Sequence, residues 1–505
     1  MRPGDVVAVL SNTPAEQVLG FLGTARVGAL PTILSHPSIK QSVDRFLESF
    51  PKILKGCNAK YALCSAMLFD PAQSWKQSHG IQTTLLPFPS LDVADGDSFA
   101  LPVSARKPEE TLFLQYSSGT TGQRKGIAVT GAMLEFQLRN IVRTLSLTRD
   151  DRVVHWLPLY HDMGLIGAFL VPLLCGFASV HLSPFEWLQK PLLLFQYTAR
   201  YQGTVWYLPN FAVNFLATRV SESALDGLKL GSLRWIFNAG ETLRPATHEK
   251  FLERFRRFHW EDRLQSAYGT AENTFAVSIS SDPGGPKRLR ADAAALTERG
   301  RFEPANEPQG RALTILSSGR PQPGQEVRIR DAQGPGSVGE IELRSGSLFS
   351  GYVENPDASG AVFTQDGWYR TGDMGFLWEG QLFVTGRAKD LIIVNGANVY
   401  PADVEEIADA IPGVKAGRAV AFGVELPSGS EGLVVMLERD ELAVPDPSLK
   451  ATLRAEVLAQ LGVALTDIRV AEPGTLLKST SGKLARGKNR ALYLERQETF
   501  SPGRG

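Results

Sequence analysis

Residues 116–126 read Tyr116-Ser-Ser-Gly-Thr-Thr-Gly-Gln-Arg-Lys-Gly126 and stand between a predicted strand, Thr111–Tyr116, and a predicted helix that begins after Thr130. Glycines let a backbone turn its N–H groups inward and approach a ligand closely. The hydroxyl donors of the segment are Ser117, Ser118, Thr120 and Thr121. Such donors suit phosphate oxygens, and the Lys125 ammonium can neutralise their charge. The segment therefore predicts a phosphate-binding loop, with an ordinary Gly- and Ser-rich surface loop as the alternative.

Strands and helices alternate on both sides of this loop. Short apolar runs predict strands at residues 6–10, 111–116, 153–157, 205–208 and 233–239. Apolar residues at helical spacing follow most of them, as in Pro14–Ala29. Alternation of this kind predicts an α/β fold with a mostly parallel sheet and helices on its faces.

The pattern changes twice in the second half of the chain. Residues 281–312 are polar with several Gly and Pro, and predict an inserted, partly irregular segment. Short strands and turns dominate residues 325–385 and predict a small, barrel-like β-subdomain. A strand–helix pattern resumes after Arg387 and continues to the C-terminus. We therefore predict a large N-terminal domain over residues 1–388 and a small, mobile α+β domain over 389–505.

The charge balance and the cysteine content of the chain exclude some classes of protein. The 505 residues carry 53 Lys and Arg against 53 Asp and Glu, so the formal net charge is zero. This argues against a nucleic-acid binder that relies on a global basic field. Three cysteines without metal-site spacing fit a reducing compartment, and the N-terminus shows no signal-peptide core, so the expected location is the cytoplasm. The uncharged stretch Met163–Val180 is interrupted by Gly and Pro and predicts a buried helix and strand rather than a membrane span.

Six more segments place chemically useful side chains at strand ends or in turns. They occupy residues 156–164, 238–241, 266–272, 367–373, 386–405 and 477–486. His161 follows a predicted strand, which is where open α/β sheets bind ligands. Glu272 is suited to Mg²⁺, and Asp373 to a ribose diol. Taken singly, such residues are more often ordinary caps, turns or tail positions.

Taken in order, the seven segments resemble the adenylate-forming superfamily of acyl-CoA synthetases, peptide-synthetase adenylation domains and luciferases. They follow the superfamily's order from Tyr116 to Arg486, so the resemblance covers essentially the whole chain. It implies a reaction that uses ATP and Mg²⁺. A carboxylate attacks the α-phosphate, giving an acyl-adenylate and pyrophosphate, and a thiol then takes the acyl group as AMP leaves.

The resemblance also implies roles for individual residues. The β- and γ-phosphates would lie against Ser117, Ser118, Gly119, Thr120, Thr121, Gly122 and Lys125. The adenine pocket would be lined by Gly240, Glu241, Tyr268, Gly269 and Thr270. The metal would be held by Glu272 and Thr120, and the ribose by Asp373 with Arg387. The groups expected to act at the reacting atoms are Lys483, His161, Thr120 and Glu272. Lys389 would be the hinge about which the small domain rotates.

Three segments resemble the fatty-acyl-AMP ligase branch in particular. They are residues 156–164, Tyr207-Leu-Pro-Asn-Phe211 and the polar segment at 281–312. In that branch the insertion restrains the C-terminal domain and disfavours CoA, so the acceptor is the phosphopantetheine thiol of an acyl carrier protein. An acyl- or aryl-CoA synthetase and a stand-alone amino-acid adenylation domain remain the alternatives.

The acid-binding pocket is the least determined part of the site. Candidates for an apolar tunnel are Trp206, Leu208, Phe211 and Phe215. Each buried aromatic is more often core packing than a tunnel wall. A long tunnel would favour fatty acids, because each buried methylene contributes about 0.8 kcal/mol.

Overall fold

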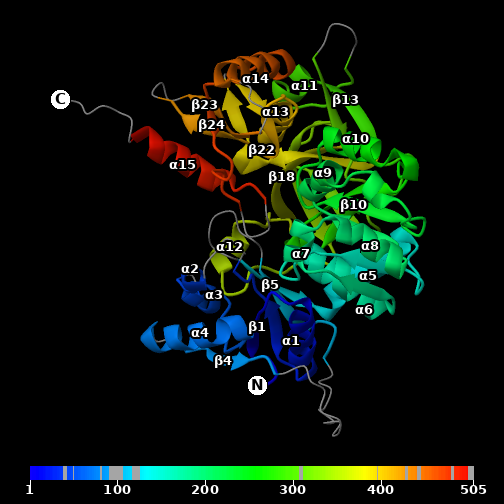
Figure 1. Ribbon diagram of the computed structural model, residues 1–505, viewed down its shortest axis with the longest axis vertical. Coiled ribbons are helices and arrows are strands. Elements are labelled where there is room, and N and C mark those ends of the chain that lie inside the picture. Colours follow the sequence, from blue (N-terminus) through cyan, green and yellow to red (C-terminus); the bar gives the residue numbers. More distant parts are fainter. Residues whose placement is uncertain are drawn as a thin grey trace, which may run out of the picture.

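The computed structural model describes residues 1–37, 43–48, 50–79, 82–89, 106–116, 125–305, 311–394, 396–426, 430–440, 445–478 and 483–498 (Figure 1). In Figure 1 the N-terminal sheet (blue) lies at the bottom and the C-terminal residues (yellow to red) form the top. The central sheet and its helices (cyan to green) lie between them.

The N-terminal sheet is parallel, with strand order β2 (Leu30–Ile33), β1 (Val6–Leu10), β3 (Tyr61–Cys64), β4 (Thr84–Pro87). Strand β1 reads VVAVL and its last four residues are completely buried, as expected for a strand covered on both faces. Its helices are α1 (Pro14–Arg26), α2 (Val43–Leu47), α3 (Phe50–Gly56) and α4 (Ala66–His79). The expected helix after the first strand is therefore present and ends at Arg26.

The central sheet has seven strands. Their order is β15 (Arg320–Pro321), β12 (Ala276–Ile279), β11 (Leu264–Gly269), β10 (Trp235–Ala239), β9 (Val205–Leu208), β7 (Arg152–His155) and β8 (Ala178–His181). The five strands from β11 to β8 are parallel, and β12 and β15 are antiparallel. The associated helices are α5 (Gly131–Leu145), α6 (Val171–Cys175), α7 (Pro184–Gln189), α8 (Leu192–Tyr201), α9 (Asn210–Arg219) and α10 (Pro245–Arg254). The predicted α/β class is confirmed.

Two local expectations need correction. The loop at 117–124 was expected to join a strand to a helix, but it joins two antiparallel strands, β5 (Thr111–Tyr116) and β6 (Gly126–Thr130). The helix itself begins as expected, at Gly131 directly after the N-cap Thr130, whose hydroxyl accepts the Met133 N–H at 3.3 Å. The uncharged stretch forms a π-helix (Met163–Leu170) followed by α6 and β8, and β8 is a partly exposed edge strand rather than a buried one.

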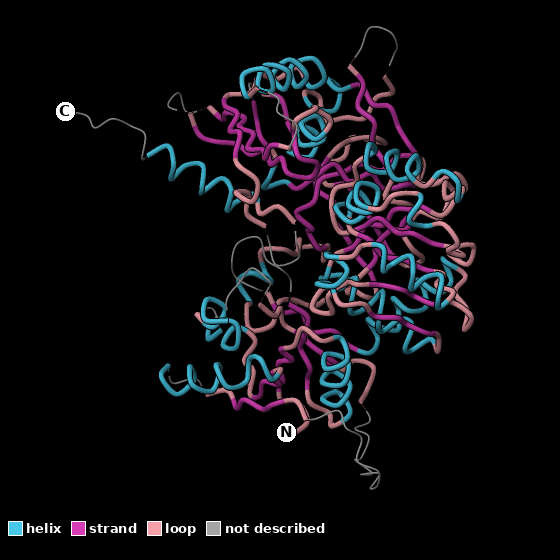
Figure 2. Tube along the Cα trace, viewed as in Figure 1, coloured by secondary structure: helices cyan, strands magenta, loops and turns pink. Residues whose placement is uncertain are grey.

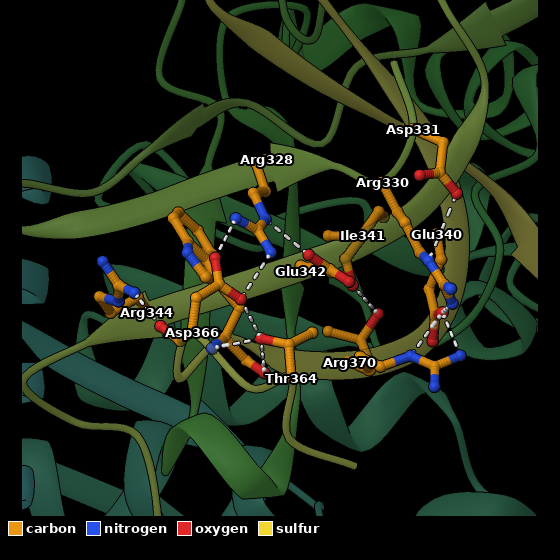
Figure 3. A network of polar contacts seen from close by, with 12 residues as sticks. Arg328, Arg330, Asp331, Glu340, Ile341, Glu342, Arg344, Thr364, Asp366 and Arg370 are labelled. Atoms are coloured by element: carbon orange, nitrogen blue, oxygen red, sulfur yellow. Dashed lines mark hydrogen bonds and ion pairs between the residues drawn. The ribbon is translucent and has the colours of Figure 1, made fainter. Parts of the chain in front are cut away.

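The β-subdomain is a four-stranded antiparallel sheet of β16 (Gln325–Ile329), β17 (Gly339–Ser345), β18 (Tyr369–Trp378) and β19 (Gln381–Arg387). Figure 3 shows a polar network on its surface, in which arginines alternate with carboxylates. Arg328 pairs with Glu342 and Asp366, and Arg370 pairs with Glu340 through two nitrogens. Opposite charges on neighbouring strands fix the register of the sheet. Helix α12 (Pro356–Gly360) lies in the connection between β17 and β18.

The segment expected to be irregular is more ordered than its composition suggests. It forms β13 (Arg288–Asp292), α11 (Ala293–Thr297) and the partner strand β14 (Ala312–Leu316). Phe302 stacks on Phe376 of the β-subdomain, with ring centroids 5.3 Å apart. Leu313 packs against this aromatic cluster and also against the core of the small domain. Alternating apolar positions on the paired strands β13 and β14 supply this contact, and a few large side chains are enough to stabilise it.

The C-terminal residues have a core of their own, which runs from Ile392 to Ile468. Its strands are β20 (Ile392–Val394), β21 (Ala397–Val399), β22 (Val414–Glu425), β23 (Glu431–Arg439) and β24 (Asp467–Ala471). Its helices are α13 (Pro401–Asp409), α14 (Asp446–Leu461) and α15 (Arg486–Glu498). Figure 2 shows α14 (cyan) on the outer side of these strands (magenta) at the top of the view. A short 3-10 turn, Ala388–Asp390, connects this unit to β19.

Within the part of the chain that the structure describes, we find no helix with the length and apolar character needed to cross a bilayer.

Candidate active site

Three predicted residues meet where the central sheet approaches the β-subdomain. Tyr268 lies near the end of β11, and Asp373 of β18 is paired in register with Arg387 of β19. The Tyr268 hydroxyl donates to Asp373 Oδ2 at 2.7 Å, and Arg387 Nε lies 2.9 Å from Asp373 Oδ1. Burial and the neighbouring Asp373 raise the pKa of Tyr268 well above its usual value. Asp373 raises the pKa of Arg387, so a fixed carboxylate is held between a neutral donor and a cation.

A second cluster brings Glu272 and Lys125 near one tyrosine. The Tyr352 hydroxyl donates to Glu272 Oε1 at 2.9 Å, and the Lys125 ammonium lies 4.4 Å from the centre of the Tyr352 ring. Tyr352 reaches this place because it forms an isolated β-bridge with Ile127 of β6, just after the phosphate-loop segment. Burial, with Glu272 next, raises the pKa of Tyr352, which keeps its hydroxyl neutral and donating. The cluster sets a carboxylate and a cation beside the start of β6.

The backbone between Gly269 and Phe275 is tightly constrained. A Cβ atom on Gly269 would lie 2.1 Å from the Phe275 carbonyl oxygen, so this position requires glycine. Thr274 has φ 64°, which a β-branched residue rarely adopts, and its hydroxyl donates to the Ser347 carbonyl at 2.8 Å. The Phe275 N–H donates to the Asn273 carbonyl at 2.6 Å and closes a γ-turn. Backbone strain of this kind is concentrated at functional sites, and here it fixes the turn that carries Glu272.

Lys483 of the small domain contacts the large domain near the end of β10. The Lys483 ammonium donates to the carbonyl oxygen of Gly240, which follows β10. Gly240 has φ 79°, and a Cβ atom there would lie 3.8 Å from Lys483 Nζ and 3.9 Å from the Met163 methyl. Lys483 also lies close enough to Asp162 to lower its pKa. Burial alone would raise that pKa, but His161, then the Met163 N–H and last Lys483, more than offset it.

His161 is held by the residue after it. Its Nδ1 lies 2.6 Å from Asp162 Oδ1, and the same carboxylate oxygen accepts the Met163 N–H at 2.7 Å, at the start of the π-helix. The Leu165 N–H donates to the His161 carbonyl at 2.8 Å. The histidine is therefore oriented at the junction between the β7 loop and a completely buried helix.

The adenine-pocket candidates divide into two groups. Tyr268 and Gly269 belong to the constrained turn, and the Thr270 hydroxyl caps the following 3-10 turn by accepting the Asn273 N–H at 3.2 Å. Glu241 instead accepts the Phe211 N–H at 2.9 Å, so its carboxylate caps the start of α9. The end of β10 beside it is held by the buried Asn238, whose amide donates to Asn210 at 3.0 Å.

The tunnel candidates do not form one surface. Trp206 packs against Phe195 and Trp260, and its indole N–H donates to Thr198 at 2.8 Å. Phe211 and Phe215 belong to another aromatic group with Trp187, at ring-centroid distances of 6.5 and 5.4 Å. Leu208, the last residue of β9, is buried. On the other face of β9, Tyr207 lies 6.2 Å from Phe275, ring centroid to ring centroid.

The hydroxyl-rich centre of the predicted phosphate loop lies outside the described residues. This applies to Ser117, Ser118, Gly119, Thr120, Thr121 and Gly122. Lys125, at its end, is described. Sequence reasoning missed Tyr352, Asp162 and Phe275. Asp162 lies within the segment 156–164 and Phe275 lies three residues after the segment 266–272, but Tyr352 lies far from every motif and only its pairing with Ile127 could reveal it.

A large parallel-sheet domain, a small α+β domain and a polar site between them are the features of adenylate-forming enzymes. The chain belongs to the family described as AMP-binding enzyme, whose match spans residues 1–353. The resemblance drawn from the seven segments is thereby confirmed, and with it the class of ligase that uses ATP.

Individual relatives are similar over nearly the whole chain. The long-chain-fatty-acid–AMP ligase FadD26 of Mycobacterium tuberculosis is 30% identical over 516 residues, covering 96% of this chain and 86% of that protein. The 4-hydroxyphenylalkanoate adenylyltransferase of the same species is 30% identical over 527 residues, covering 98% and 83%. A structure from a study of fatty acyl-adenylate ligases from E. coli and L. pneumophila has a TM-score of 0.87 at 27% identity, covering 99% and 90%. The resemblance to the fatty-acyl-AMP ligase branch is therefore confirmed.

Proposed function

We propose that this protein joins a carboxylic acid of the fatty class to the α-phosphate of ATP, releases pyrophosphate, and transfers the acyl group to the phosphopantetheine thiol of a carrier protein. One observation carries the proposal. Lys483 of the small domain reaches the Gly240 carbonyl beside His161 and Asp162, so a single cation from a separate domain stands at the centre of the site. The names of the relatives FadD26 and of the solved acyl-adenylate ligases support the fatty class of substrate.

The polar clusters suit the parts of ATP. An ionised carboxylate has about four acceptor positions, so Asp373 can accept bonds from the two ribose hydroxyls while Tyr268 and Arg387 keep it oriented. Lys125 stands at the end of the hydroxyl-rich loop, where phosphates would lie. Glu272, with Thr120 as proposed from the sequence, would hold Mg²⁺, an ion that commonly binds one or two carboxylates and completes its shell with phosphate oxygens and waters. When bound, the ion would neutralise phosphate charge.

The first chemical step sets two anions against each other. The acid's carboxylate oxygen attacks the α-phosphorus, the bond to the bridging oxygen breaks, and pyrophosphate leaves with that oxygen. Lys483 would exchange its bond to the Gly240 carbonyl for bonds to the carboxylate and the α-phosphate. His161, oriented by Asp162, would close the acyl side of the site. Most of the rate enhancement would come from charge neutralisation and positioning, because no proton must move.

The second step requires a different residue set at the same place. We propose Lys389 in the Ala388–Asp390 turn as the hinge, with residues 1–388 and 389–505 as the moving units. Rotation would withdraw Lys483 and admit the thiol. Leu313, directly after the segment at 281–312, packs against the core of the small domain and against the cluster that contains Phe302 of the segment, and this contact supports the proposal that the segment restrains the small domain. Restraint of that kind would favour a carrier protein over free CoA.

The acyl group would enter beside the π-helix. Tyr207 and Phe275 lie next to Gly167, where an added Cβ would come within 2.7 Å of the Phe275 ring. Phe211 and Phe215 of α9 remain proposed contributors, with Leu208 at the end of β9. Trp206 was also expected to line the tunnel, but it packs into the core against Phe195 and Trp260 instead.

The test is mass spectrometry of the products. The protein is incubated with ATP, Mg²⁺ and pooled fatty, aryl and amino acids, with CoA or a phosphopantetheinylated carrier as acceptor. Acyl-adenylate that persists with CoA and disappears with the carrier is the expected result. Rapid acyl-CoA formation would instead identify a CoA synthetase, and an amino-acyl product would identify an amino-acid adenylation domain.

A further inference from the structure

Helix α10 of the large domain begins at the boundary with the small domain. Its N-cap residue is Arg244, and Pro245 occupies the first helical position. An arginine side chain has donors but no acceptor, so it cannot cap the free N–H groups of its own helix. The sequence therefore leaves a positive helix end next to a cation, and both need acceptors from elsewhere.

The small domain supplies those acceptors from one face of α13. Arg244 Nη2 lies 2.9 Å from Glu405 Oε2, and Nη1 lies 2.6 Å from Asp409 Oδ2. The Ala246 N–H donates to Glu406 Oε1 at 2.9 Å, so a carboxylate from another domain caps α10. The Arg244 side chain is 18% exposed and that of Glu405 6%, so the pairing is largely shielded from water. Figure 1 shows α13 and α10 in neighbouring parts of the upper half of the molecule.

Glu405 also forms an ion pair within the small domain. Glu405 Oε1 accepts from Arg486 Nη2 at 2.8 Å, and Arg486 Nη1 donates to Asp390 at 2.8 Å. Arg486 is three residues after Lys483, and Asp390 directly follows Lys389. One chain of ion pairs thus joins Arg244 to both the Lys483 segment and the hinge turn.

We propose that Arg244 is a positioning residue that holds the small domain in the orientation in which Lys483 enters the active site. The inference rests on the proposed function. Arg244 and Ala246 lie before the hinge, and the three carboxylates that they contact lie after it, so rotation about Lys389 must separate them. The Arg486 pairs lie entirely on the small-domain side and move with it. Arg244 therefore stabilises adenylation and has no part in the transfer orientation.

Physical reasoning gives the expected size of the effect. Truncating one partner of a shielded ion pair leaves the remaining charges without compensation, which shifts the docked population by at least about tenfold. Around Arg244 these charges are Glu405, Asp409 and Glu406, with Glu241 and Asp403 nearby. Their mutual repulsion would then favour rotation of the small domain away from α10.

The test uses the full chain with Arg244→Ala, Asp409→Ala and the double variant. Adenylation is measured as pyrophosphate release with dodecanoic acid and ATP, and transfer as pantetheine thioester formed from synthetic dodecanoyl-adenylate. Arg256→Ala, which removes an exposed arginine of the same domain, is the matched control. Small-angle scattering measures the radius of gyration of every variant without requiring catalysis.

We expect both single variants to lose at least about tenfold in adenylation turnover, with transfer unchanged or faster and a larger radius of gyration. The double variant should lose little more than either single one, because the two residues act together. Equal loss in both half-reactions, or a radius of gyration like that of the control, would overturn the proposal. If the wild type releases no pyrophosphate with any acid, the proposed function fails, and the scattering comparison still decides whether Arg244 holds the domains together.

Discussion

The chemical roles of several side chains in this protein depend on contacts with residues that are distant in the sequence. Lys483 is near the C-terminus and looks like a mobile tail residue, yet it donates to the Gly240 carbonyl. Asp373 looks like a turn residue, yet both of its oxygens are engaged by residues from two other strands. Burial and these partners convert common residue types into a site.

Replacing Lys483 by alanine separates the two half-reactions. The loss of its ammonium removes the cation proposed to bridge the carboxylate and the α-phosphate, so adenylation should fall by about 100-fold or more. Transfer from preformed dodecanoyl-adenylate should stay within about twofold. Pyrophosphate release and thioester formation measure the two steps. Lys488→Ala, an exposed lysine of α15, should leave both unchanged, and an equal loss in both steps for Lys483→Ala would refute its assigned role.

Tyr268→Phe tests the proposed ribose site. Without the Tyr268 hydroxyl, Asp373 loses one of the donors that orient it. The KM for ATP should therefore rise about tenfold while kcat changes little. Tyr493→Phe removes a comparable bond to Asp467 in the small domain, at 2.9 Å, and is the matched control. Initial rates at varied ATP decide the question. If kcat falls and KM does not change, Tyr268 acts on the reacting groups rather than on the nucleotide.

At the scale of elements, the segment at 281–312 links two cores. A polar, Gly- and Pro-containing sequence folds here into β13, α11 and β14 because a few apolar residues find partners outside it. Phe302 contributes most, since it stacks on Phe376 and meets Trp378 edge-on at 4.8 Å. The order of this segment therefore depends on the β-subdomain beneath it.

Phe302→Ala should release the segment without unfolding the protein. Removing a buried phenylalanine costs about 3–5 kcal/mol, and most of that loss should fall on the local structure. Amide exchange in residues 288–305 and 311–316 should accelerate, and dodecanoyl-CoA should form where little formed before. Phe258→Ala, in a 3-10 turn of the large domain, is the control for general destabilisation. Faster exchange without CoA activity would show that the segment does not govern acceptor choice.

At the scale of the whole molecule, the domain boundary concentrates acidic groups. Burial, with Glu406 next, raises the pKa of Asp403 from 3.8 to about 7, and burial raises that of Asp409 to about 6. A carboxyl whose pKa is raised by folding stabilises the protein while it is protonated. For Asp403 this stabilisation is lost as the pH rises from the pKa of the unfolded chain, near 4, through the pKa of the folded protein, near 7.

Asp403→Asn should therefore stabilise the protein more at pH 8 than at pH 5. Asparagine cannot ionise, so it avoids the repulsion from Glu405 and Glu406 that Arg244 only partly offsets. The gain at pH 8 should be on the order of 2 kcal/mol and should shrink toward pH 5. Denaturant titrations at the two pH values measure it. The exposed Asp331→Asn serves as the control, and a gain that is independent of pH would contradict the predicted titration.

Much of the fold could be predicted from the sequence because its signals are local. Apolar runs gave β1 and β5 at their observed bounds, and Thr130 was identified as the N-cap of α5. The seven ordered motifs identified the family, since their residue types and spacing are themselves sequence properties. Strand β6 was not predicted, because the apolar pattern of a five-residue strand directly before a helix is too short to be told apart from the helical pattern.

By itself, then, the sequence determined the α/β class, the family and the residue types that we propose to bind the nucleotide. Only the tertiary structure decided which of those residues meet. Tyr352 joins Glu272 through a single β-bridge, Trp206 turns toward α8, and Arg244 finds its acceptors on α13. Such contacts depend on strand register, on which face of a strand a side chain occupies, and on the packing of two domains. None of these is encoded within a short window of sequence.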